Sequence, residues 1–216
     1  MRVQVVREIL SANDQIAQAN QRLLDENGIL AVNLMASPGA GKTSLILATI
    51  AATRGRARLG VIEGDLASRI DADRVAREKV PVVQINTGGG CHLDAPQVSR
   101  ALESLPLEQL DILLIENVGN LVCPANFRLG AHRAVVIASV PEGDDKPFKY
   151  PGIFAGADAV VLNKTDLLPY IAFDLARFRR GLQAVNPKAP LLSLSCASGQ
   201  GLPAWVDWLL GQFKPR

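Results

Sequence analysis

The sequence has few of the features that mark secreted, membrane-spanning or nucleic-acid-binding proteins. Its three cysteines are an odd and sparse set, which makes a poor disulfide framework and fits a reducing compartment. No stretch approaches the roughly eighteen apolar residues that a membrane span requires, and the first residues lack the apolar run of a signal peptide. We therefore expect a cytoplasmic protein with no membrane partner.

An excess of charge of one sign is missing as well. Lysine and arginine together number 23, aspartate and glutamate 21, and aromatic residues make up only 5% of the chain. Nucleic-acid-binding surfaces are built from clustered basic and stacking aromatic side chains, so we expect no nucleic-acid partner. The 48% of hydrophobic and 20% of charged residues are typical of a globular protein with a packed core.

Seven apolar runs of strand length largely alternate with segments of helical spacing. The expected strands are 29–36, 58–63, 80–86, 111–118, 133–140, 158–163 and 190–195. Helical spacing occurs at 43–54, 69–78, 93–104, 170–185 and 202–213, and residues 3–27 have the pattern of an amphipathic helix. This alternation predicts an α/β fold with a single wound, mostly parallel seven-stranded sheet, helices on both of its faces, and an N-terminal amphipathic helix. We expect one domain over 1–216, with the helix in 1–28, the sheet in 29–216 and a long polar loop over 141–157.

The first expected strand runs directly into a glycine-rich loop that is followed by a helix. In this context the sequence SPGAGKTS predicts a P-loop, whose backbone N–H groups and helix N-terminus face phosphate groups. Lys42 would reach the β- and γ-phosphates, and the Thr43 hydroxyl would ligate Mg²⁺. Ala36 replaces the usual first glycine, but the phosphate-contacting part of the pattern is intact. The expected phosphate-binding residues are Ser37, Gly39, Ala40, Gly41, Lys42, Thr43 and Ser44.

Guanine recognition is predicted at the ends of the sixth and seventh strands. The sequence Asn163-Lys164-Thr165-Asp166 matches the NKxD pattern, in which a carboxylate accepts hydrogen bonds from two neighbouring guanine donors that adenine lacks. Backbone N–H groups of the segment Ser195-Cys196-Ala197 are expected to meet the guanine carbonyl oxygen, so Cys196 is expected to be structural. These patterns predict a P-loop GTPase that binds GTP and GDP, with its G domain in 29–216.

Acidic residues that follow two strands are the candidates for a magnesium site. Glu116 ends the strand DILLIENV and Asp65 follows the second strand; with Thr43 they make a plausible Mg²⁺ site. Gly119 is expected next to the γ-phosphate. Asn120 stands where many GTPases carry the glutamine that orients the attacking water, and no arginine finger is evident. We therefore expect slow intrinsic hydrolysis, with Lys42, Asp65, Glu116 and Gly119 as the catalytic set.

A second metal site is suggested by two segments that follow neighbouring strands. Cys91 and His92 lie after the third strand and Cys123 after the fourth, so they could meet at one edge of a parallel sheet. Thiolate and imidazole ligands suit Ni²⁺ or Zn²⁺ and leave the carboxylates for Mg²⁺. Taken alone, the residues are equally compatible with a buried cysteine beside a glycine-rich turn and an unrelated loop cysteine.

Several motifs together resemble the HypB family of GTPases, which serve nickel insertion into [NiFe]-hydrogenase. They are SPGAGKTS, EGDLAS, TGGGCHLDA, IENVGNLVCPA, EGDDKPFKYPG and NKTD, spread over nearly the whole chain. The resemblance implies a metal on Cys91, His92 and Cys123, a GTP-dependent homodimer across the nucleotide-bearing face, and a HypA-like nickel chaperone and the hydrogenase large subunit as partners. Lys149, in the segment KPFKYPG, is a candidate for an ion pair across that dimer interface.

The chain departs from the family pattern in two ways, and other assignments stay open. It has neither the N-terminal cysteine motif nor the histidine-rich stretch of some HypB proteins, so a nickel store is not expected. Its other histidine, His132, is expected to be an ordinary surface or packing residue. The urease-maturation GTPase UreG is one alternative. The corresponding loop of UreG resembles Cys-Pro-His, however, whereas cysteine and histidine are adjacent in this chain. A cobalamin-enzyme chaperone GTPase is another, as is a metal-binding scaffold that scarcely hydrolyses GTP.

Overall fold

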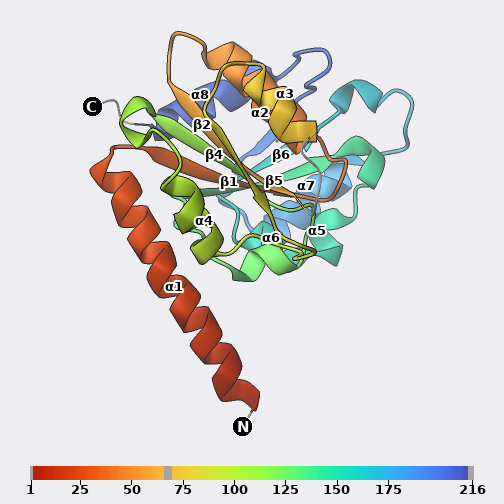
Figure 1. Cartoon of the computed structure of the whole chain (residues 1–216). Coiled ribbons are helices and arrows are strands. Elements are labelled where there is room, and N and C mark those ends of the chain that lie inside the picture. The colour runs from red at the N-terminus through yellow and green to blue at the C-terminus, as the bar shows by residue number, and fades with distance from the viewer. Residues whose placement is uncertain (1, 66–69, 214–216) are drawn as a thin grey trace.

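A seven-stranded sheet forms the centre of the computed structural model, which describes residues 2–65 and 70–213. The strand order is β3-β2-β4-β1-β5-β6-β7, and every neighbouring pair is parallel (Figure 1). The strands are β1 (Leu30–Ala36), β2 (Leu59–Asp65), β3 (Val82–Asn86), β4 (Ile112–Glu116), β5 (Arg133–Ser139), β6 (Ala159–Asn163) and β7 (Leu191–Ser193). All seven predicted strands are present. The inner strands are covered on both faces, which is why they read in the sequence as continuous apolar runs.

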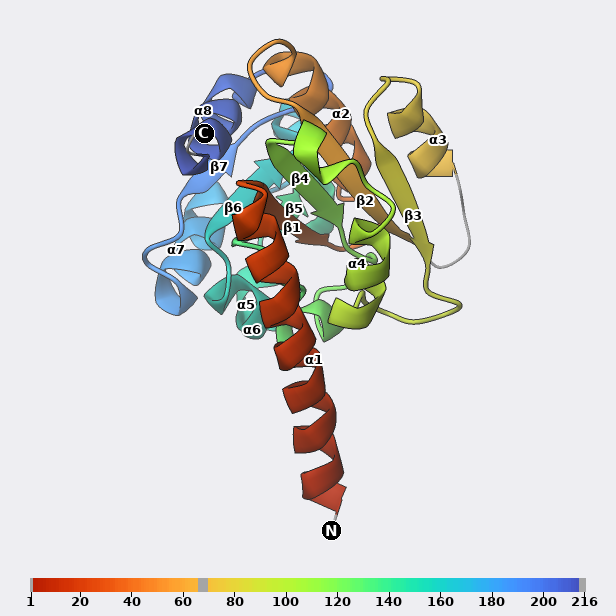
Figure 2. The same cartoon turned by 60° about the vertical axis from the view of Figure 1, so that its left-hand side comes forward.

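Helices cover both faces of the sheet, as predicted (Figure 2). On one face α2, α3 and α8 pack against the strands through residues such as Leu45, Val75 and Trp205. The other face is covered by α1 and α4 at one end and by α6 and α7 at the other. The α-helices are α1 (Arg2–Glu26), α2 (Lys42–Thr53), α3 (Ile70–Ala76), α4 (Ala95–Leu102), α5 (Lys146–Lys149), α6 (Pro151–Ala155), α7 (Leu175–Val185) and α8 (Leu202–Gln212). Short 3₁₀ helices are η1 (Leu107–Gln109), η2 (Cys123–Asn126), η3 (Val140–Glu142) and η4 (Thr165–Leu167).

The described side chains of the N-terminal helix α1 that hold it to the body lie in its middle and C-terminal parts. Figures 1 and 2 show its N-terminal part extending away from the sheet, while the rest runs along α4. Two buried asparagines hold this part in place. Asn13 donates to the Arg128 carbonyl oxygen and accepts from the Ala95 N–H, and Asn20 donates to the carbonyl oxygens of Ala95 and Leu129. These bonds attach α1 to the start of α4 and to the loop before β5.

The prediction of a long polar loop over 141–157 is wrong. This segment contains the end of η3 and the short helices α5 and α6. Pro147 and Pro151 lie in the first turn of these two helices, where proline is tolerated because the missing N–H would have no helical partner. Prolines and charges made the segment look like a loop, but Phe154 is completely buried and anchors it.

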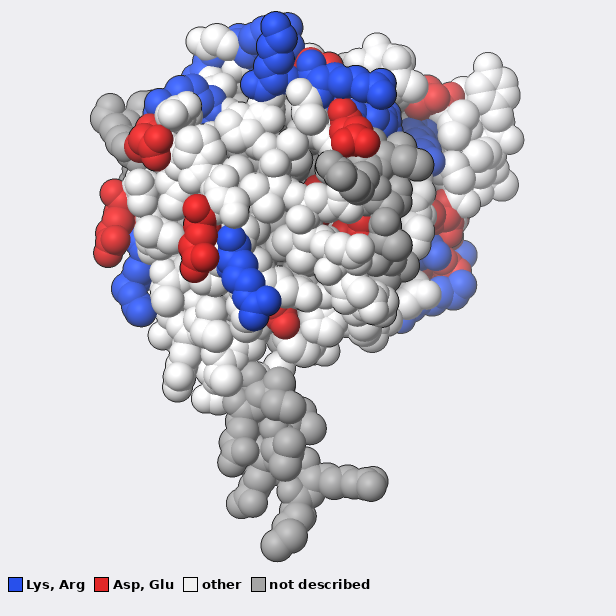
Figure 3. Space-filling view, in the orientation of Figure 1, with Lys and Arg blue, Asp and Glu red and all other residues white. Residues whose placement is uncertain are grey.

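The charged surface agrees with the balanced composition. Figure 3 shows acidic and basic side chains scattered over one face. The largest basic group lies along the top edge, where Figure 1 places α2 and the loop after it. Over the described residues, no helix is both long and apolar enough to cross a membrane.

Candidate nucleotide and metal site

The P-loop connects β1, in the middle of the sheet, to α2. Gly39 and Gly41 have φ angles of +76° and +101°, a left-handed conformation that side-chain-bearing residues rarely adopt. The turn aims the loop and the first amides of α2 outward from the carboxyl edge of the sheet, the usual place for ligands in wound α/β proteins. Lys42, the first residue of α2, is buried with its Nζ 3.7 Å from Glu116 Oε1.

Two buried glutamates lie side by side beneath this loop. Glu116 at the end of β4 is the register partner of Glu63 in β2. Burial is the main cause that raises the pKa of Glu63 to about 10, and the neighbouring Glu116 raises it further. Burial also raises the pKa of Glu116, while Lys42 and the Thr43 hydroxyl act in the opposite direction. Without a cation, this pair therefore holds at least one proton at neutral pH.

These residues fit a magnesium ion. Thr43 Oγ1 donates to Glu116 Oε1 at 3.1 Å, so the two predicted ligands are brought together. Glu116 Oε2 and Glu63 Oε2 are both buried and have no hydrogen-bond partner among the described residues, an arrangement that a divalent cation would relieve. Asp65, the third predicted ligand, is the half-buried last residue of β2, and its carbonyl oxygen accepts the Thr87 N–H at 3.0 Å. Its role as a magnesium ligand stays a prediction.

Glu63 was missed in the sequence because the expected strand ended at this residue, whereas β2 continues to Asp65 and places Glu63 inside a strand covered on both faces. The only available signal was an acidic residue in a buried run, two positions before Asp65. Buried acids are rare unless they are paired or ligate a metal. That rule would have selected Glu63 once both faces of β2 were known to be covered.

The loop after β4 passes close to the P-loop. A Cβ on Gly119 would lie 2.9 to 3.1 Å from atoms of Pro38, so only glycine fits at this contact. Asn120 does not extend as a free side chain: its Oδ1 accepts the N–H groups of Val122 at 2.8 Å and Cys123 at 3.4 Å. Asn120 thus shapes the turn that carries Cys123.

The NKxD residues are tied to the P-loop by direct hydrogen bonds. Asn163 is buried; its Nδ2 donates to the Ala40 carbonyl oxygen at 3.1 Å. Lys164, with a left-handed φ of +61°, donates from Nζ to the Gly39 carbonyl oxygen at 2.7 Å. Asp166 Oδ1 is buried and has no partner among the described residues. An unpartnered carboxylate oxygen beside a rigid phosphate loop fits the guanine donors that the sequence predicts.

The Ser195-Cys196-Ala197 segment follows β7 and closes this side of the site. The Cys196 N–H donates to Asn163 Oδ1 and the Ala197 N–H to Ser195 Oγ, both at 3.2 Å. These two amides are engaged within the chain, so their contact with a guanine carbonyl oxygen stays a prediction. Burial raises the pKa of Cys196 to about 11, which fits a structural thiol more than a metal ligand.

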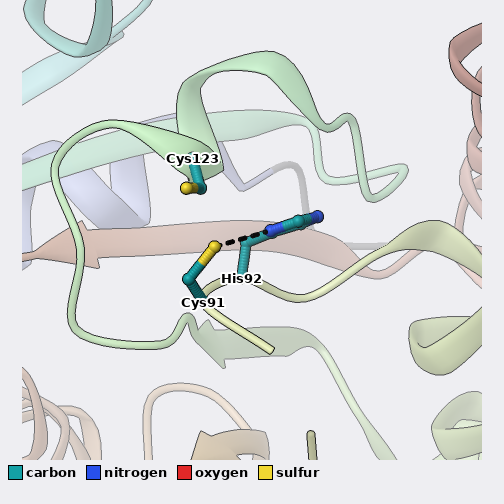
Figure 4. A group of neighbouring side chains, drawn as sticks. All are labelled: Cys91, His92 and Cys123. Carbon is teal, nitrogen blue, oxygen red and sulfur yellow. Dashed lines mark hydrogen bonds between the residues drawn. The ribbon is translucent and has the colours of Figure 1, made fainter. Parts of the chain in front are cut away.

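Cys91, His92 and Cys123 form a cluster at the same edge. Their candidate ligand atoms all lie within 4.8 Å of one another, and Cys91 Sγ is 3.5 Å from His92 Nδ1. Figure 4 shows that Cys123, the first residue of η2, faces the Cys91–His92 pair from the other side of the cluster. The His92 ring lies against Phe127, with centroids 3.8 Å apart.

Burial lowers the pKa of His92, and a hydrogen bond with Cys123 raises the pKa of Cys91. The imidazole is therefore neutral and ready to ligate, whereas thiol protons must leave when a metal binds.

Two other predicted residues lie away from the cluster. His132 accepts the Ala31 N–H on Nδ1 and meets Asp25 Oδ1 through Nε2, each at 2.9 Å. These contacts are those of a packing residue. Lys149 forms an ion pair within its own chain, with Nζ 2.6 Å from Asp145 Oδ2, and this contact raises the pKa of Lys149. An ion pair to another chain would have to replace or share this partner.

Comparisons with known proteins agree with this architecture. Residues 30–193 match the family described as "CobW/HypB/UreG, nucleotide-binding domain". The "Hydrogenase maturation factor HypB" of Rhizobium leguminosarum bv. viciae is 47% identical over 207 residues, which cover 96% of this chain and 69% of that protein. The crystal structure of HypB from Archaeoglobus fulgidus has a TM-score of 0.89 and 38% identity, covering 94% of this chain and all of that one. HypB from Helicobacter pylori in complex with nickel has the same TM-score and 37% identity, covering 94% and 98% of the two chains.

Proposed function

The chain belongs to the HypB hydrogenase maturation factors within the CobW/HypB/UreG family, and we propose that it is a GTP-hydrolysing metallochaperone that helps insert nickel into the [NiFe]-hydrogenase large subunit. One observation carries the proposal. Strand β4 serves both sites, because Glu116 at its end contacts Thr43 and Lys42, while the loop that follows it brings Cys123 to Cys91 and His92.

In the nucleotide half of the mechanism, this chain positions GTP and neutralises its charge. The P-loop amides and Lys42 hold the phosphates, and Asp166 accepts the guanine donors. Thr43 and Glu116, with Asp65, would hold Mg²⁺, which supplies electrostatic stabilisation of the phosphoryl oxygens. Since the Oδ1 of Asn120 is engaged by backbone amides, this side chain does not take the part of the glutamine that orients the attacking water in many GTPases. Hydrolysis is expected to be slow, on the order of 10⁻⁴ to 10⁻² per second.

In the metal half, the cysteine and histidine set holds nickel or zinc as cargo. Three protein ligands leave the coordination of a transition metal incomplete. A GTP-dependent homodimer across this face would let two copies share thiolates, with a HypA-like chaperone delivering nickel and the hydrogenase large subunit receiving it. The exposure of Cys91 supports transfer, because the ion remains accessible to a receiving ligand.

The proposal is tested by titrating nickel and zinc into the GDP-bound and GTP-bound protein while its mass in solution is followed. We expect GTP to favour the dimer and to change the metal affinity. By linkage, the metal should change the affinity for GTP by the same factor. Identical metal affinities and identical masses in the two states would overturn nucleotide-controlled metal transfer and leave only a nucleotide-binding protein with a separate metal site.

A further inference from the structure

Asn117 lies between the two halves of the site and is not a predicted ligand of either metal. It follows Glu116 in the chain and is fully buried. Its Oδ1 accepts the Leu93 N–H at 3.0 Å and the Val118 N–H at 2.9 Å, and its Nδ2 donates to Asn33 Oδ1 at 3.2 Å. Leu93 is the residue after His92. One side chain thus joins the residue beside a candidate magnesium ligand to the residue beside a candidate nickel ligand.

The contact is reinforced by close packing on the neighbouring strand. Leu93 is completely buried, and a Cβ on Gly64 would lie 2.8 Å from Leu93 side-chain carbons and 2.9 Å from the Glu116 carbonyl oxygen. The metal-bearing loop therefore rests on the ends of β2 and β4, the two strands that carry the acidic pair. In such close packing, a small displacement of one part is passed on to its neighbour.

The metal loop is attached on its other side to α1, through a different asparagine. Asn13 accepts the Ala95 N–H at 2.9 Å and donates to the Arg128 carbonyl oxygen at 2.9 Å. Ala95 begins α4 shortly after His92, and Arg128 follows Cys123 and η2. Asn13 thus holds the metal loop from the α1 side, and among the described residues its side-chain hydrogen bonds go to Ala95 and Arg128, not to the end of β4.

We propose that Asn117 is the positioning residue that couples the nucleotide state to the metal site. When the phosphates and the cation interact with Glu116, the backbone at residues 116–118 shifts. The Asn117 carboxamide transmits this shift to the Leu93 amide and so to His92. The inference rests on the proposed function, because it assigns a residue to the coupling that the function requires.

The test compares Asn117→Ala with Asn13→Ala. Nickel dissociation constants are measured for each protein in the GDP and GTP states, and their ratio gives a coupling factor. In Asn117→Ala, the coupling factor should be at least fivefold closer to one than in the wild-type protein. The affinity for GDP should change less than about threefold, since the side chain does not face the nucleotide. Asn13→Ala should weaken nickel binding equally in both states and keep the wild-type factor.

A conservative variant separates positioning from general loosening. Asn117→Asp retains the oxygen that accepts the Leu93 N–H and loses the donor to Asn33 Oδ1, a contact that rotation of the Asn33 amide can restore by turning its own N–H toward the carboxylate. It should therefore keep most of the coupling. Loss of the coupling factor in Asn13→Ala to the same extent as in Asn117→Ala would overturn the proposal, because any loosening of the loop would then suffice.

A measurement on the wild-type protein covers the case in which Asn117→Ala does not fold. The Leu93 amide should exchange its hydrogen at different rates in the GDP and GTP states, and equal rates would overturn the role of Asn117. A wild-type coupling factor of one would overturn the proposed function as well. A factor well above one that survives in Asn117→Ala would overturn this inference alone.

Discussion

The proposed guanine side (163–166 and 195–197) and the proposed metal side (Cys91, His92 and Cys123) share one edge of the sheet but are built differently. On the guanine side, buried Asn163 bonds to both the P-loop and the loop after β7, and Lys164 bonds to the P-loop again. On the metal side, Cys91 is exposed on a glycine-rich loop, and Cys123 arrives on a separate turn. The difference suggests that guanine recognition needs a preorganised pocket, because specificity depends on the cost of unpaired buried groups. A transferred ion instead needs ligands that a receiving protein can reach.

The largest expected effect is on hydrolysis, in Lys42→Ala. This change removes the ammonium group that lies 3.7 Å from Glu116 Oε1 and is predicted to reach the phosphates, so GTP turnover should fall on the order of 10² to 10³-fold. Phosphate release measured with GTP in excess tests this. Nickel binding by the GDP form should change little, since Lys42 is not part of the cysteine cluster. Turnover within threefold of wild type would contradict the assignment.

Removal of one thiolate should weaken metal binding and leave nucleotide binding unchanged. Cys123→Ala should weaken nickel and zinc binding on the order of 100-fold, because even indirect partners of metal ligands are worth 10- to 100-fold. Calorimetric titration of both metals measures the change. Cys196→Ala is the matched control, since Cys196 lies on the guanine side. If the two variants lose metal affinity equally, the cluster is not the binding site.

Guanine preference should depend on Asp166. An amide at this position cannot accept from both guanine donors, so Asp166→Asn should weaken GTP binding at least tenfold, about 1.4 kcal/mol. Competition between GTP and xanthosine triphosphate provides the readout, with the exposed Asp207→Asn on α8 as control. A variant that still prefers GTP would show that base recognition lies elsewhere.

The last prediction concerns how stability depends on pH. The pKa of Glu63 is about 10 in the fold against an ordinary value of 4.5, so the folded state keeps a proton that the unfolded chain has lost between these values. The free energy of unfolding of protein free of nucleotide and metal should therefore decrease as pH rises through this window. Glu63→Gln removes this contribution while keeping the shape.

Thermal melting in a chelator, at about pH 6 and about pH 9, measures the Glu63 contribution. Between these two pH values, the melting temperature of Glu63→Gln should fall less than that of the wild-type protein. The effect of pH on the two proteins should become more alike as the pH is lowered towards 4.5. Asp207→Asn, at an exposed position on α8, is a control away from the acidic pair. Parallel pH profiles for wild type and Glu63→Gln would mean that Glu63 is not protonated in the fold.

The sequence predicted the repeating parts of the molecule well. Strands covered on both faces appear as apolar runs, and the P-loop follows the first of them, so these elements could be recognised from local pattern alone. The segment 141–157 was misjudged because prolines that begin short helices look like loop residues. Glu63 and Asn117 were overlooked because their importance depends on neighbours distant in the chain: Glu63 on Glu116, and Asn117 on Leu93 and Asn33.

The sequence by itself determined which chemistries are available, since residues that follow parallel strands must emerge at one edge of the sheet. Only the tertiary structure decided which of them meet. The strand order places β4 between β2 and β1, which sets Glu116 beside Glu63 and beneath the P-loop and carries Cys123 to Cys91 and His92. Strand order follows from the packing of apolar faces and from hydrogen bonds between distant segments, and no local pattern of residues encodes these pairings.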